Sequence, residues 1–409
     1  MAAPESGAAG RVRLRGPGIV LLFAGTLLTA AGYGSTFLLT DHFRALGGSE
    51  IEVGHVLGGA VVGTLIGVPA VGWLGARFGG ARLAGVGSLL LALGYFMLAS
   101  LTSLSPLIAV AGLLIGLGWG TFYLAAPIAV SERVTDEDRG FWFTRFGAFQ
   151  MAGIGGGPML ALLLADTLQV SPSSIFRFVA SGCCIAAACL WTFDRVLPRP
   201  YAAGNRGQAE ATQSANWIRS LGAIGRTRAR YPIVMVGLGA CVFTGIMTFQ
   251  SSLVRDSGLN AGVYFTTYAI VVVAARFFLA ATMARADGDK TSIVLLILMT
   301  AGVLAMFAIG LGLAIQLASA ILLALGYGLV YTIIQTQAVN DAPERHRNGA
   351  LTWFVISYFL GIFGFPAIGG WILASAGKTT FLVVVLACAT LELLIAEIRR
   401  RDTKGSASL

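Results

Sequence analysis

Charged side chains are scarce in this chain of 409 residues. Asp, Glu, Lys and Arg together make up 11% of it, whereas hydrophobic residues make up 56%. A soluble globular domain carries about 25% charged residues. The composition therefore excludes an ordinary soluble protein and predicts a chain that is largely surrounded by lipid.

Acidic residues and histidines are the rarest polar groups, with 19 Asp and Glu and only 3 His against 28 Lys and Arg. The basic residues lie in short loops between apolar stretches and form no stripe, so we predict no nucleic-acid partner. The apolar stretches contain no His/Asp/Glu cluster, Ser–His pair or metal-ligand spacing, and the chain has no Gly-rich phosphate loop. We therefore predict that the protein is not an enzyme and holds neither a cofactor nor a metal.

Cysteine is also sparse, and all five cysteines fall inside apolar segments: Cys183, Cys184, Cys189, Cys241 and Cys388. They have neither metal-ligand spacing nor polar neighbours in the sequence. We expect buried, chemically inert thiols.

Long apolar runs, by contrast, fill the sequence. Twelve runs approach the roughly 20 residues that a helix needs to cross a bilayer. They lie near 17–40, 51–74, 83–101, 106–130, 142–165, 175–194, 232–254, 261–284, 291–312, 316–339, 350–373 and 379–397. Because no water satisfies open backbone groups in the bilayer, each run is predicted to be a helix. The 54 glycines fit this all-α membrane fold, since small residues let membrane helices approach closely.

The two halves of the chain repeat each other at a shift of 208 positions. Leu117–Gly120 with Tyr123 recurs as Leu325–Gly328 with Tyr331, within the related segments 105–140 and 313–349. The same shift places Arg77 on Arg285, Arg82 on Lys290 and Pro158 on Pro366. We predict two pseudo-symmetric six-helix bundles, and repeat interfaces of this kind hold substrate sites in transporters. The predicted parts are a tail (1–16), a first bundle (17–194), a linker (195–231), a second bundle (232–397) and a tail (398–409).

The positive residues predict the orientation in the membrane. With the N-terminus in the cytoplasm, 22 of the 28 Lys and Arg residues fall in cytoplasmic segments. The first apolar run is too long for a signal-peptide core and is expected to remain as a span. We predict a multi-pass protein of the bacterial inner membrane with both termini in the cytoplasm. The second part of the linker, around Trp217 and Ile224, is expected to form a short helix on the membrane surface; a flexible linker is the alternative.

Several local motifs carry a family resemblance. The segment Gly72–Arg82 (GWLGARFGGAR), with its Gly72, Arg77, Gly79 and Arg82, resembles the signature loop between spans two and three of the major facilitator superfamily. Leu46–Gly54 resembles the start of span two in drug and metabolite efflux members, and Arg139-Gly140 and Arg347–Gly349 resemble the arginine-glycine that opens spans five and eleven. The resemblance covers nearly the whole chain. It implies that spans one, four, seven and ten line a central cavity, with contributions from spans two, five, eight and eleven.

The sequence departs from the family pattern at several positions. An aspartate that latches helix ends in the family is replaced by Ala76 in the first half and by Ala284, before Arg285, in the second. The arginine that efflux members often have in span four, where it is implicated in proton coupling, is replaced by Gly112. We therefore expect a different latch. We also do not expect this chain to use the proton coupling of typical efflux members unchanged.

Span five contains Gly153–Pro158 (GIGGGP), which resembles the glycine-proline signature of antiporters. Gly153, Gly157 and Pro158 are predicted to give a bendable helix that packs closely on a neighbour. Pro366 marks the related remnant in span eleven. The motif favours export, with plain helix packing as the alternative.

Polar and aromatic residues in the expected cavity spans are the candidate substrate site. These are Tyr33, Trp119, Tyr123, Gln150, Gln250, Tyr268, Arg276, Tyr327, Tyr331 and Gln335. Hydroxyls, amides and rings suit a polar organic solute. Arg276, an ionisable residue inside a span, is predicted to hold an anionic substrate or pair with an acid; the alternative is that it ties helix ends at the cytoplasmic interface. Glu392 is interpreted as a structural or interfacial residue.

Three residues are the candidates for proton coupling. Asp41 and His42 are neighbours near the outer end of span one, and His55 lies near the outer start of span two. An Asp beside a His can exchange a proton between pH 5 and 8. The alternative is that Asp41 caps its helix or pairs with Arg44.

Together these features predict a secondary active transporter that works by alternating access. We expect a monomeric exporter, driven by the proton gradient, of a small polar or anionic molecule such as a metabolite, a siderophore-like compound or a drug. A uniporter or proton-linked importer on the same fold is the alternative. A transport-dead membrane receptor or a membrane-embedded enzyme is a more remote one.

Overall fold

The computed structural model describes residues 16–198 and 217–407 and is almost entirely helical, without a strand among these residues. Within these two ranges, eleven helical stretches are long and apolar enough to cross a membrane. The last of them, Gly349–Asp402, is interrupted at Gly377, where the backbone has φ 80°. This interruption divides it into two passes, so the twelve predicted spans are confirmed.

The first bundle contains the first six passes, and its first pass is broken by a 3₁₀ turn. Its elements are α1 (Pro17–Gly34), η1 (Ser35–Leu38), α2 (Leu39–Ala45), α3 (Glu50–Phe78), α4 (Gly80–Ala99), α5 (Leu107–Ser131), α6 (Asp136–Leu168) and α7 (Pro172–Val196). The helix α9 (Trp217–Ile224) precedes the second bundle. The end of α9 does not lie free on a membrane surface, because Ile224 is buried against Ala229, Ala342 and Ala350 of the second bundle.

The second bundle repeats this plan, and its first and fifth passes are irregular. Its elements are α10 (Arg230–Thr248), α11 (Gln250–Val254), η2 (Arg255–Ser257), α12 (Ala261–Arg285), α13 (Gly288–Phe307), η3 (Ile309–Leu311), α14 (Leu313–Asn340), η4 (Glu344–His346), α15 (Arg347–Phe359), the π-helical turn η5 (Leu360–Gly364) and α16 (Phe365–Ala407). A π-turn inside a helix is rare and often marks a functional site.

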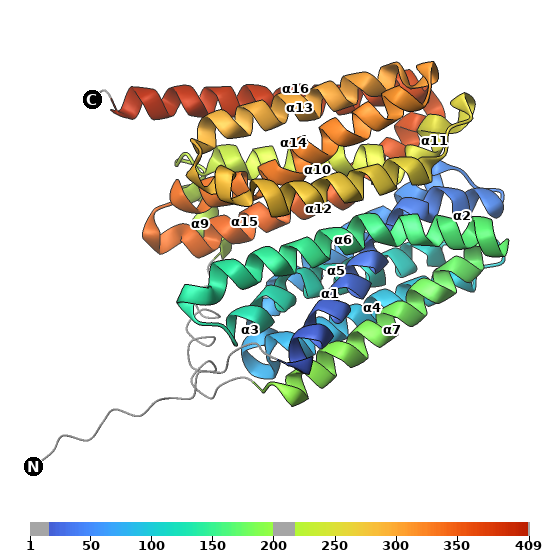
Figure 1. Ribbon diagram of the computed structural model, residues 1–409, viewed down its shortest axis with the longest axis horizontal. Coiled ribbons are helices and arrows are strands. Elements are labelled where there is room, and N and C mark those ends of the chain that lie inside the picture. Colours follow the sequence, from blue (N-terminus) through green and yellow to red (C-terminus); the bar gives the residue numbers. More distant parts are fainter. Residues whose placement is uncertain (1–15, 199–216, 408–409) are drawn as a thin grey trace, which may run out of the picture.

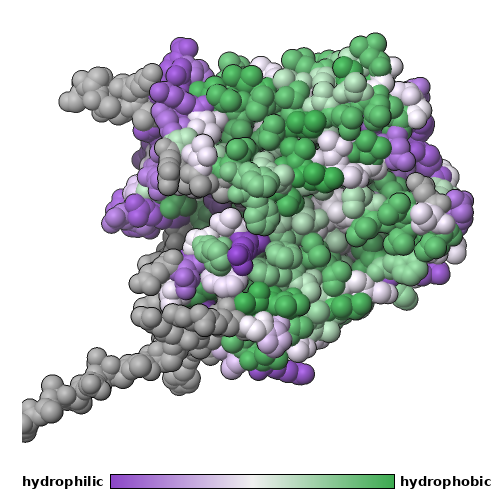
Figure 2. All heavy atoms as spheres, in the orientation of Figure 1, coloured by the Kyte–Doolittle hydropathy of each residue, from purple (hydrophilic) through white to green (hydrophobic). Residues whose placement is uncertain are grey.

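Figure 1 shows the two bundles side by side, with α1 to α7 in one and α10 to α16 in the other. Helix α1 begins and α16 ends at the same end of the molecule, which we call the terminal end. The other end, where α2 and α11 lie, is called the distal end. On the face drawn in Figure 2, a broad apolar belt separates more polar ends. Large apolar side chains point outward, such as Phe278, which is 82% exposed. Such a surface is suited to lipid.

Glycines set the spacing of α3 and α5 and explain one departure from the family pattern. A Cβ atom at Gly112 of α5 would lie 1.8 Å from the carbonyl oxygen of Val56 on α3, and one at Gly116 would lie 2.0 Å from that of Ala60. No side chain fits at either position without separating the helices. The arginine that efflux members carry in this span is therefore excluded at Gly112 by packing.

At the terminal end of the first bundle, a network of charges joins α4, α5 and α7. Arg133, only 2% exposed, donates to Asp194 at 2.6 Å and to the carbonyl oxygen of Leu197 at 2.6 Å. Arg82 donates to the other oxygen of Asp194 at 2.6 Å. Glu132 accepts a hydrogen bond of 3.2 Å from the backbone nitrogen of Gly80, the first residue of α4. A carboxylate at a helix N-terminus is favourable, so Glu132 stabilises the start of α4 where the aspartate expected at Ala76 is missing.

The second bundle has the same kind of network with the signs exchanged. Asp341 stands at the position equivalent to Arg133, and Arg399 of α16 donates to it at 2.8 Å and also binds Asp289. Asp287 caps α13 by accepting from the backbone nitrogens of Asp289 and Lys290 at 3.0 and 3.2 Å. Each network lies within one bundle and fixes its helix ends.

Candidate functional site

Residues that are equivalent by the repeat contact each other where the two bundles meet. The hydroxyls of Tyr123 and Tyr331 are 2.5 Å apart, and the Thr40 hydroxyl donates to the carbonyl oxygen of Thr248 at 3.1 Å. Arg44 donates to the Ser252 hydroxyl at 3.1 Å. All three pairs are separated by 208 residues. Equivalent residues touch only near a symmetry axis, so the pseudo-twofold axis passes through these pairs.

Stacked aromatic rings fill the space around this axis. Tyr33 of α1 stacks on Trp119 of α5 with centroids 4.4 Å apart and an interplanar angle of 8°. In the second bundle Phe243 of α10 stacks on Tyr327 of α14 at 4.5 Å and 5°. Trp119 and Tyr327 are equivalent by the repeat. Each bundle thus presents a parallel ring pair, built from its first and fourth spans, to the centre.

Other aromatic contacts cross from one bundle to the other. Tyr123 stacks on Tyr358 of α15 at 5.4 Å, and Tyr33 meets the edge of Phe363 in η5 at 5.9 Å. Phe37 of η1 meets Phe243 at 5.8 Å. Of the predicted site residues, five from spans one, four and ten thus lie in one aromatic cluster: Tyr33, Trp119, Tyr123, Tyr327 and Tyr331. In this state rings from both bundles occupy the centre.

Arg276 lies where α12, α14 and α6 come together. Its Nε and Nη2 atoms donate to the carbonyl oxygen of Gly328 at 3.1 and 2.9 Å, and its Nη1 approaches Gly147 of α6. The guanidinium is within electrostatic range of four tyrosine rings: Tyr123, Tyr268, Tyr327 and Tyr331. Among the described residues, no carboxylate lies within salt-bridge distance of it. Arg276 is therefore a cation between the bundles that is held by dipoles and not neutralised.

Several buried polar atoms around the centre have no hydrogen-bond partner among the described residues. They are the hydroxyls of Tyr33 and Tyr268, Nε1 of Trp119 and Nε2 of Gln150. Both amide atoms of Gln250, which begins α11 at the distal end, also lack a partner among these residues. Buried polar atoms are nearly always paired in folded proteins, and an unpaired one costs about 1–3 kcal/mol. Their concentration in a predicted binding region indicates a place for water or a polar ligand. Gln335, by contrast, is half-buried one turn beyond Tyr331 towards the terminal end.

At the distal end, polar side chains tie the two bundles together. Asp41 accepts a hydrogen bond of 2.8 Å from Ser251, and Glu50 accepts one of 2.5 Å from Ser252. Arg44 reaches Glu50 at 3.3 Å, and Arg255 reaches it at 3.6 Å. The molecule is therefore closed at this end in the state described.

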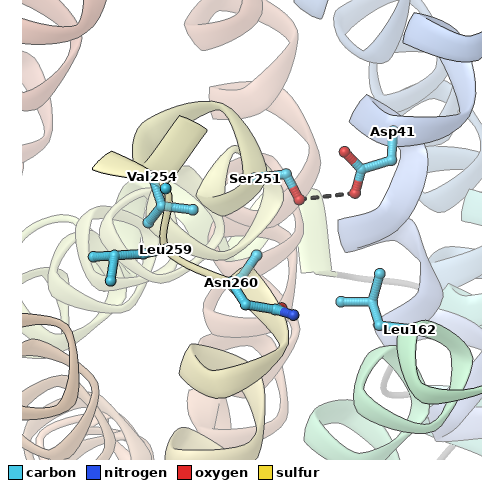
Figure 3. A pocket seen from close by; sticks show the side chains of 8 residues that line it. Asp41, Leu162, Ser251, Val254, Leu259 and Asn260 are labelled. Carbon is cyan, nitrogen blue, oxygen red and sulfur yellow. Dashed lines mark hydrogen bonds between the residues drawn. The ribbon is translucent and has the colours of Figure 1, made fainter. Parts of the chain in front are cut away.

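A pocket of about 380 Å³ opens beside these contacts (Figure 3). Asp41 and Ser251 line it, together with Leu162 of α6 and residues of the turn that leads into α12. Figure 3 shows the Asn260 side chain directed towards the gap between its own turn and Leu162. The pocket thus lies between the two bundles, next to the distal contacts.

The predicted proton-coupling residues are not brought together. Asp41 faces the second bundle, whereas His42 is 1% exposed and packs edge-on against Phe176 of α7 at 4.7 Å. Both ring nitrogens of His42 lack a hydrogen-bond partner in the described part of the chain. His55 is exposed on α3. Asp41 and His42 thus lie in different surroundings, and the alternative contact between Asp41 and Arg44 is present at 3.4 Å.

The signature-loop residues lie at the terminal end of the first bundle. Gly79 links α3 to α4 with φ 90°, a conformation that favours glycine. Arg77 lies over the rings of Trp73 and Phe78, each at 5.7 Å, and Gly72 is inside α3. Arg285 ends α12, and its side chain lies outside the described residues.

The glycine-proline motif forms tight seams. Cβ atoms at Gly153 and Gly157 of α6 would lie 2.4 Å from the Leu27 and 2.6 Å from the Ala31 carbonyl oxygens of α1, and Pro158 lies inside α6. Gly155 faces the second bundle, where a Cβ would lie 2.4 Å from that of Ala269 on α12.

A matching seam joins α3 to the segment that begins at Pro366 in α16. There Cβ atoms at Gly54 and Gly370 would lie 2.7 Å from the carbonyl oxygen of Ala367 and 2.1 Å from that of Glu50. The bundles therefore meet along two seams, α6 with α12 and α3 with α16, on either side of the central rings.

Sequence reasoning did not find several groups of this site. The Gly328 carbonyl carries no side-chain signal. The partners at the distal end, Thr248 and Ser252, were detectable in principle, because the 208-residue shift maps them onto Thr40 and Arg44. Phe243 has no aromatic equivalent in span one and could be found only from the structure.

Comparison with known proteins agrees with this architecture. The model of the Major Facilitator Superfamily matches residues 21–366. Among solved structures, the chain is similar to an auto-inhibited peptide transporter of the POT family, with TM-score 0.66 and 15% identity over 95% of this chain and 97% of that one. It is also similar to a D-xylose–proton symporter, with TM-score 0.66 and 16% identity over 93% and 96%.

At these identities the two structures show a shared fold and no more. A search of curated proteins gave no match. The family model, however, spans most of the sequence and both bundles. The chain therefore belongs to the Major Facilitator Superfamily and is a multi-pass membrane transporter.

Proposed function

We propose that the protein exports a small organic anion by alternating access, in exchange for protons. The observation that carries the proposal is Arg276, a cation between the bundles whose donors meet only the Gly328 carbonyl among the described residues. An arginine without a carboxylate is costly in a membrane interior unless something else neutralises it. A bound anion supplies that charge, and the guanidinium plane suits carboxylate or phosphate oxygens.

The surroundings of Arg276 support an organic solute over an inorganic ion. Tyrosine side chains surround the guanidinium, and Trp119, Gln150 and Tyr33 supply further unpartnered donors. Flat rings suit stacking on a substrate with aromatic or unsaturated parts. For such a substrate to bind, the ring pairs that now occupy the centre must separate, which is the movement that alternating access requires.

The seams support alternating access. Transport against a gradient requires that the two bundles seal tightly whenever the substrate path is closed. At Gly155 and Gly54 the helices approach so closely that no side chain fits between them. A uniporter or proton-linked importer on the same fold remains the second candidate, favoured by the loss of the span-four arginine at Gly112.

The distribution of positive charge gives the proposed orientation in the membrane. Because most of the described Lys and Arg residues lie towards the terminal end, we place that end in the cytoplasm of a bacterial inner-membrane protein. The distal end then faces outward, and Asp41 of the distal pocket is where protons first enter. Both halves of the site come from one chain, so the working unit is a monomer.

Anion binding is the test of this proposal. We expect organic anions from a panel of mono- and dicarboxylates and phosphorylated or sulfonated aromatics to raise the melting temperature of the purified protein. In Arg276→Ala the affinity should fall about 10- to 100-fold, which corresponds to the loss of a charge-assisted contact of about 1.5–3 kcal/mol. Arg145→Ala is the matched control, since that arginine is exposed on α6. Stabilisation by neutral or cationic compounds alone, or unchanged binding in Arg276→Ala, would refute the anion site.

A further inference from the structure

A buried carboxyl group lies inside the second bundle, away from the central site. Glu392 of α16 is 1% exposed, and neither of its oxygens has a hydrogen-bond partner among the described residues. It lies against Gly239, the middle residue of α10 (Arg230–Thr248), and seven residues before Arg399, about 10 Å along α16 at 1.5 Å per residue. A bilayer core is about 30 Å thick. The carboxyl group therefore lies inside the bilayer core, level with the middle of α10.

A glycine of α10 makes the room for this carboxyl group. A Cβ atom at Gly239 would lie 2.8 and 2.9 Å from the two oxygens of Glu392. Any other residue at this position would push the carboxyl group out of its niche. The niche is thus formed by the packing of α10 on α16.

The titratable neighbours of Glu392 are two thiols. Cys388 lies one turn away on its own helix, and Cys241 lies on α10. The two thiols contact each other. Neither brings a positive charge to the carboxyl group.

On α16 itself, Glu397 and Arg399 follow Glu392 by five and seven residues; Arg400 and Arg401 hold Glu397, and Asp289 and Asp341 hold Arg399. The charged groups of the other helices lie far along those helices from the niche. Helix α10 has Arg230 and Tyr231 at its terminal end, and α13 has Asp289 and Lys290 at its terminal end; η5 has no ionisable residue. Helix α3 contacts α16 through Gly54 and Gly370, in the part of α16 before the interruption at Gly377, whereas Glu392 lies in the part after it. Among the described residues, no charged side chain therefore contacts Glu392.

An ionised carboxylate without partners is strongly disfavoured in such surroundings. Glu392 therefore carries its proton in the state described. The proton can leave only if water or a cation reaches the carboxyl group, and that requires α10 and α16 to separate. Binding of the proton and packing of these two helices are consequently linked.

Helix α10 also carries contacts between the bundles. One turn beyond Gly239, Phe243 stacks on Tyr327 and meets Phe37 of the first bundle. At the distal end of the same helix, the carbonyl oxygen of Thr248 accepts the bond from Thr40. A displacement of α10 relative to α16 thus acts on the central rings and on the distal closure.

We propose that Glu392 is a proton-binding site of the second bundle, whose proton holds α10 against α16 and favours the state closed at the distal end. This proposal rests on the proposed proton-coupled function and identifies a residue for it. On release of the proton, the carboxylate draws water into the niche, α10 shifts, and the distal contacts open. Asp41 and Glu392 would then bind protons on opposite sides of the central site.

Infrared spectroscopy of the protein in liposomes tests the proton on Glu392 directly. The wild type should show the carbonyl band of a buried protonated carboxylic acid at neutral pH, and the band should disappear as the pH is raised. Glu392→Gln should lack this band. Glu397→Gln, altered on the same helix at a carboxylate held by Arg400 and Arg401, should retain it. A band that persists in Glu392→Gln would overturn the proposal.

Distances between spin labels at the distal end test the coupling. Labels on side chains introduced at the exposed positions Leu104 and Leu311, attached by a chemistry that spares the native cysteines, report opening between the bundles. We expect the label distance to lengthen with rising pH in the wild type and in Glu397→Gln, and to stay short in Glu392→Gln. In Gly239→Ala, which displaces the carboxyl group, the label distance should lengthen at a lower pH than in the wild type. This variant replaces Glu392→Gln in the test if Glu392→Gln does not fold.

An unchanged pH response in Glu392→Gln, or no response in the wild type, would overturn the proposal. Anion binding by the wild type is measured separately by its melting temperature. If anions do not bind but the label distance still responds to pH through Glu392, only the anion-export function is refuted. If anions bind but the pH response does not depend on Glu392, only the role of Glu392 is refuted.

Discussion

At the scale of single residues, the tyrosine pair on the axis joins the two bundles by one short hydrogen bond. Tyr123 and Tyr331 are equivalent by the repeat, and their hydroxyls are 2.5 Å apart. The bond lies on the path between the central rings and the terminal end. It must break whenever the bundles separate there.

We expect Tyr123→Phe to favour opening at the terminal end. Loss of this hydrogen bond removes about 1 kcal/mol from the closed state, which is about a fivefold change in the equilibrium between the two states. Hydrogen–deuterium exchange of α5 and α14 should become faster. Tyr264→Phe is the control, because its hydroxyl lies 3.3 Å from Ser319 within one bundle. Equal exchange in both variants would show that the tyrosine pair does not hold the bundles.

The residue scale is also where sequence reasoning was weakest. Asp41 and His42 are neighbours in sequence, but adjacent residues on a helix point about 100° apart. One therefore faces the second bundle and the other the interior of the first. Similarly, the position of Glu392 along its span suggested an interface, whereas its direction around the helix places it against Gly239. Rotation about a helix axis is poorly fixed by sequence when apolar residues surround the helix.

At the scale of helices, glycine seams determine how closely the bundles approach. Gly155 on α6 packs against Ala269 on α12, whereas the next residue, Gly156, has open space at its Cβ position. The two neighbours therefore provide a matched test of the seam.

Gly155→Ala should force α6 and α12 apart. Its Cβ would lie 2.4 Å from that of Ala269, and overpacking of this kind costs about 1–3 kcal/mol. We expect a lower melting temperature and a longer distance between labels on the two bundles. Gly156→Ala should leave the distance unchanged and stabilise α6 slightly, since alanine favours helix. If the two variants behave alike, the seam does not set the contact between the bundles.

The helices themselves were the most predictable level. Their apolar runs follow from the thickness of the bilayer, and the twelve passes were found in sequence because each run satisfies the same length requirement. The missed details are local. They include the break at Ser35–Leu38 and the π-turn at Leu360–Gly364, where packing between helices overrides the regular pattern.

At the scale of the whole molecule, the 208-residue repeat fixes where the halves meet. The repeat predicted two bundles, and its equivalent residues Thr40 and Thr248 lie in contact at the distal end. The repeat does not extend to the charges of the side chains. Arg133 and Asp341 occupy equivalent positions with opposite charge. Arg276 has no charged equivalent in the first half, because the same shift places it on an apolar valine of α3.

This asymmetry explains why the fold could be predicted from the sequence and the substrate could not. Symmetry and bilayer thickness define the bundles. The substrate site, in contrast, depends on the single cation Arg276, on a backbone carbonyl, and on rings whose directions arise from packing between the bundles. These are properties of the assembled molecule.

Flux under an imposed pH gradient tests the central claim most directly. Proteoliposomes are loaded at acidic or alkaline pH, and uptake of the organic anion that stabilises the protein most is followed. Exchange with protons predicts that an acidic interior drives uptake in whichever orientation the protein inserts, and that Arg276→Ala abolishes it. Uptake driven only by an acidic exterior, or no uptake above that of protein-free liposomes, would contradict proton-coupled export of an anion.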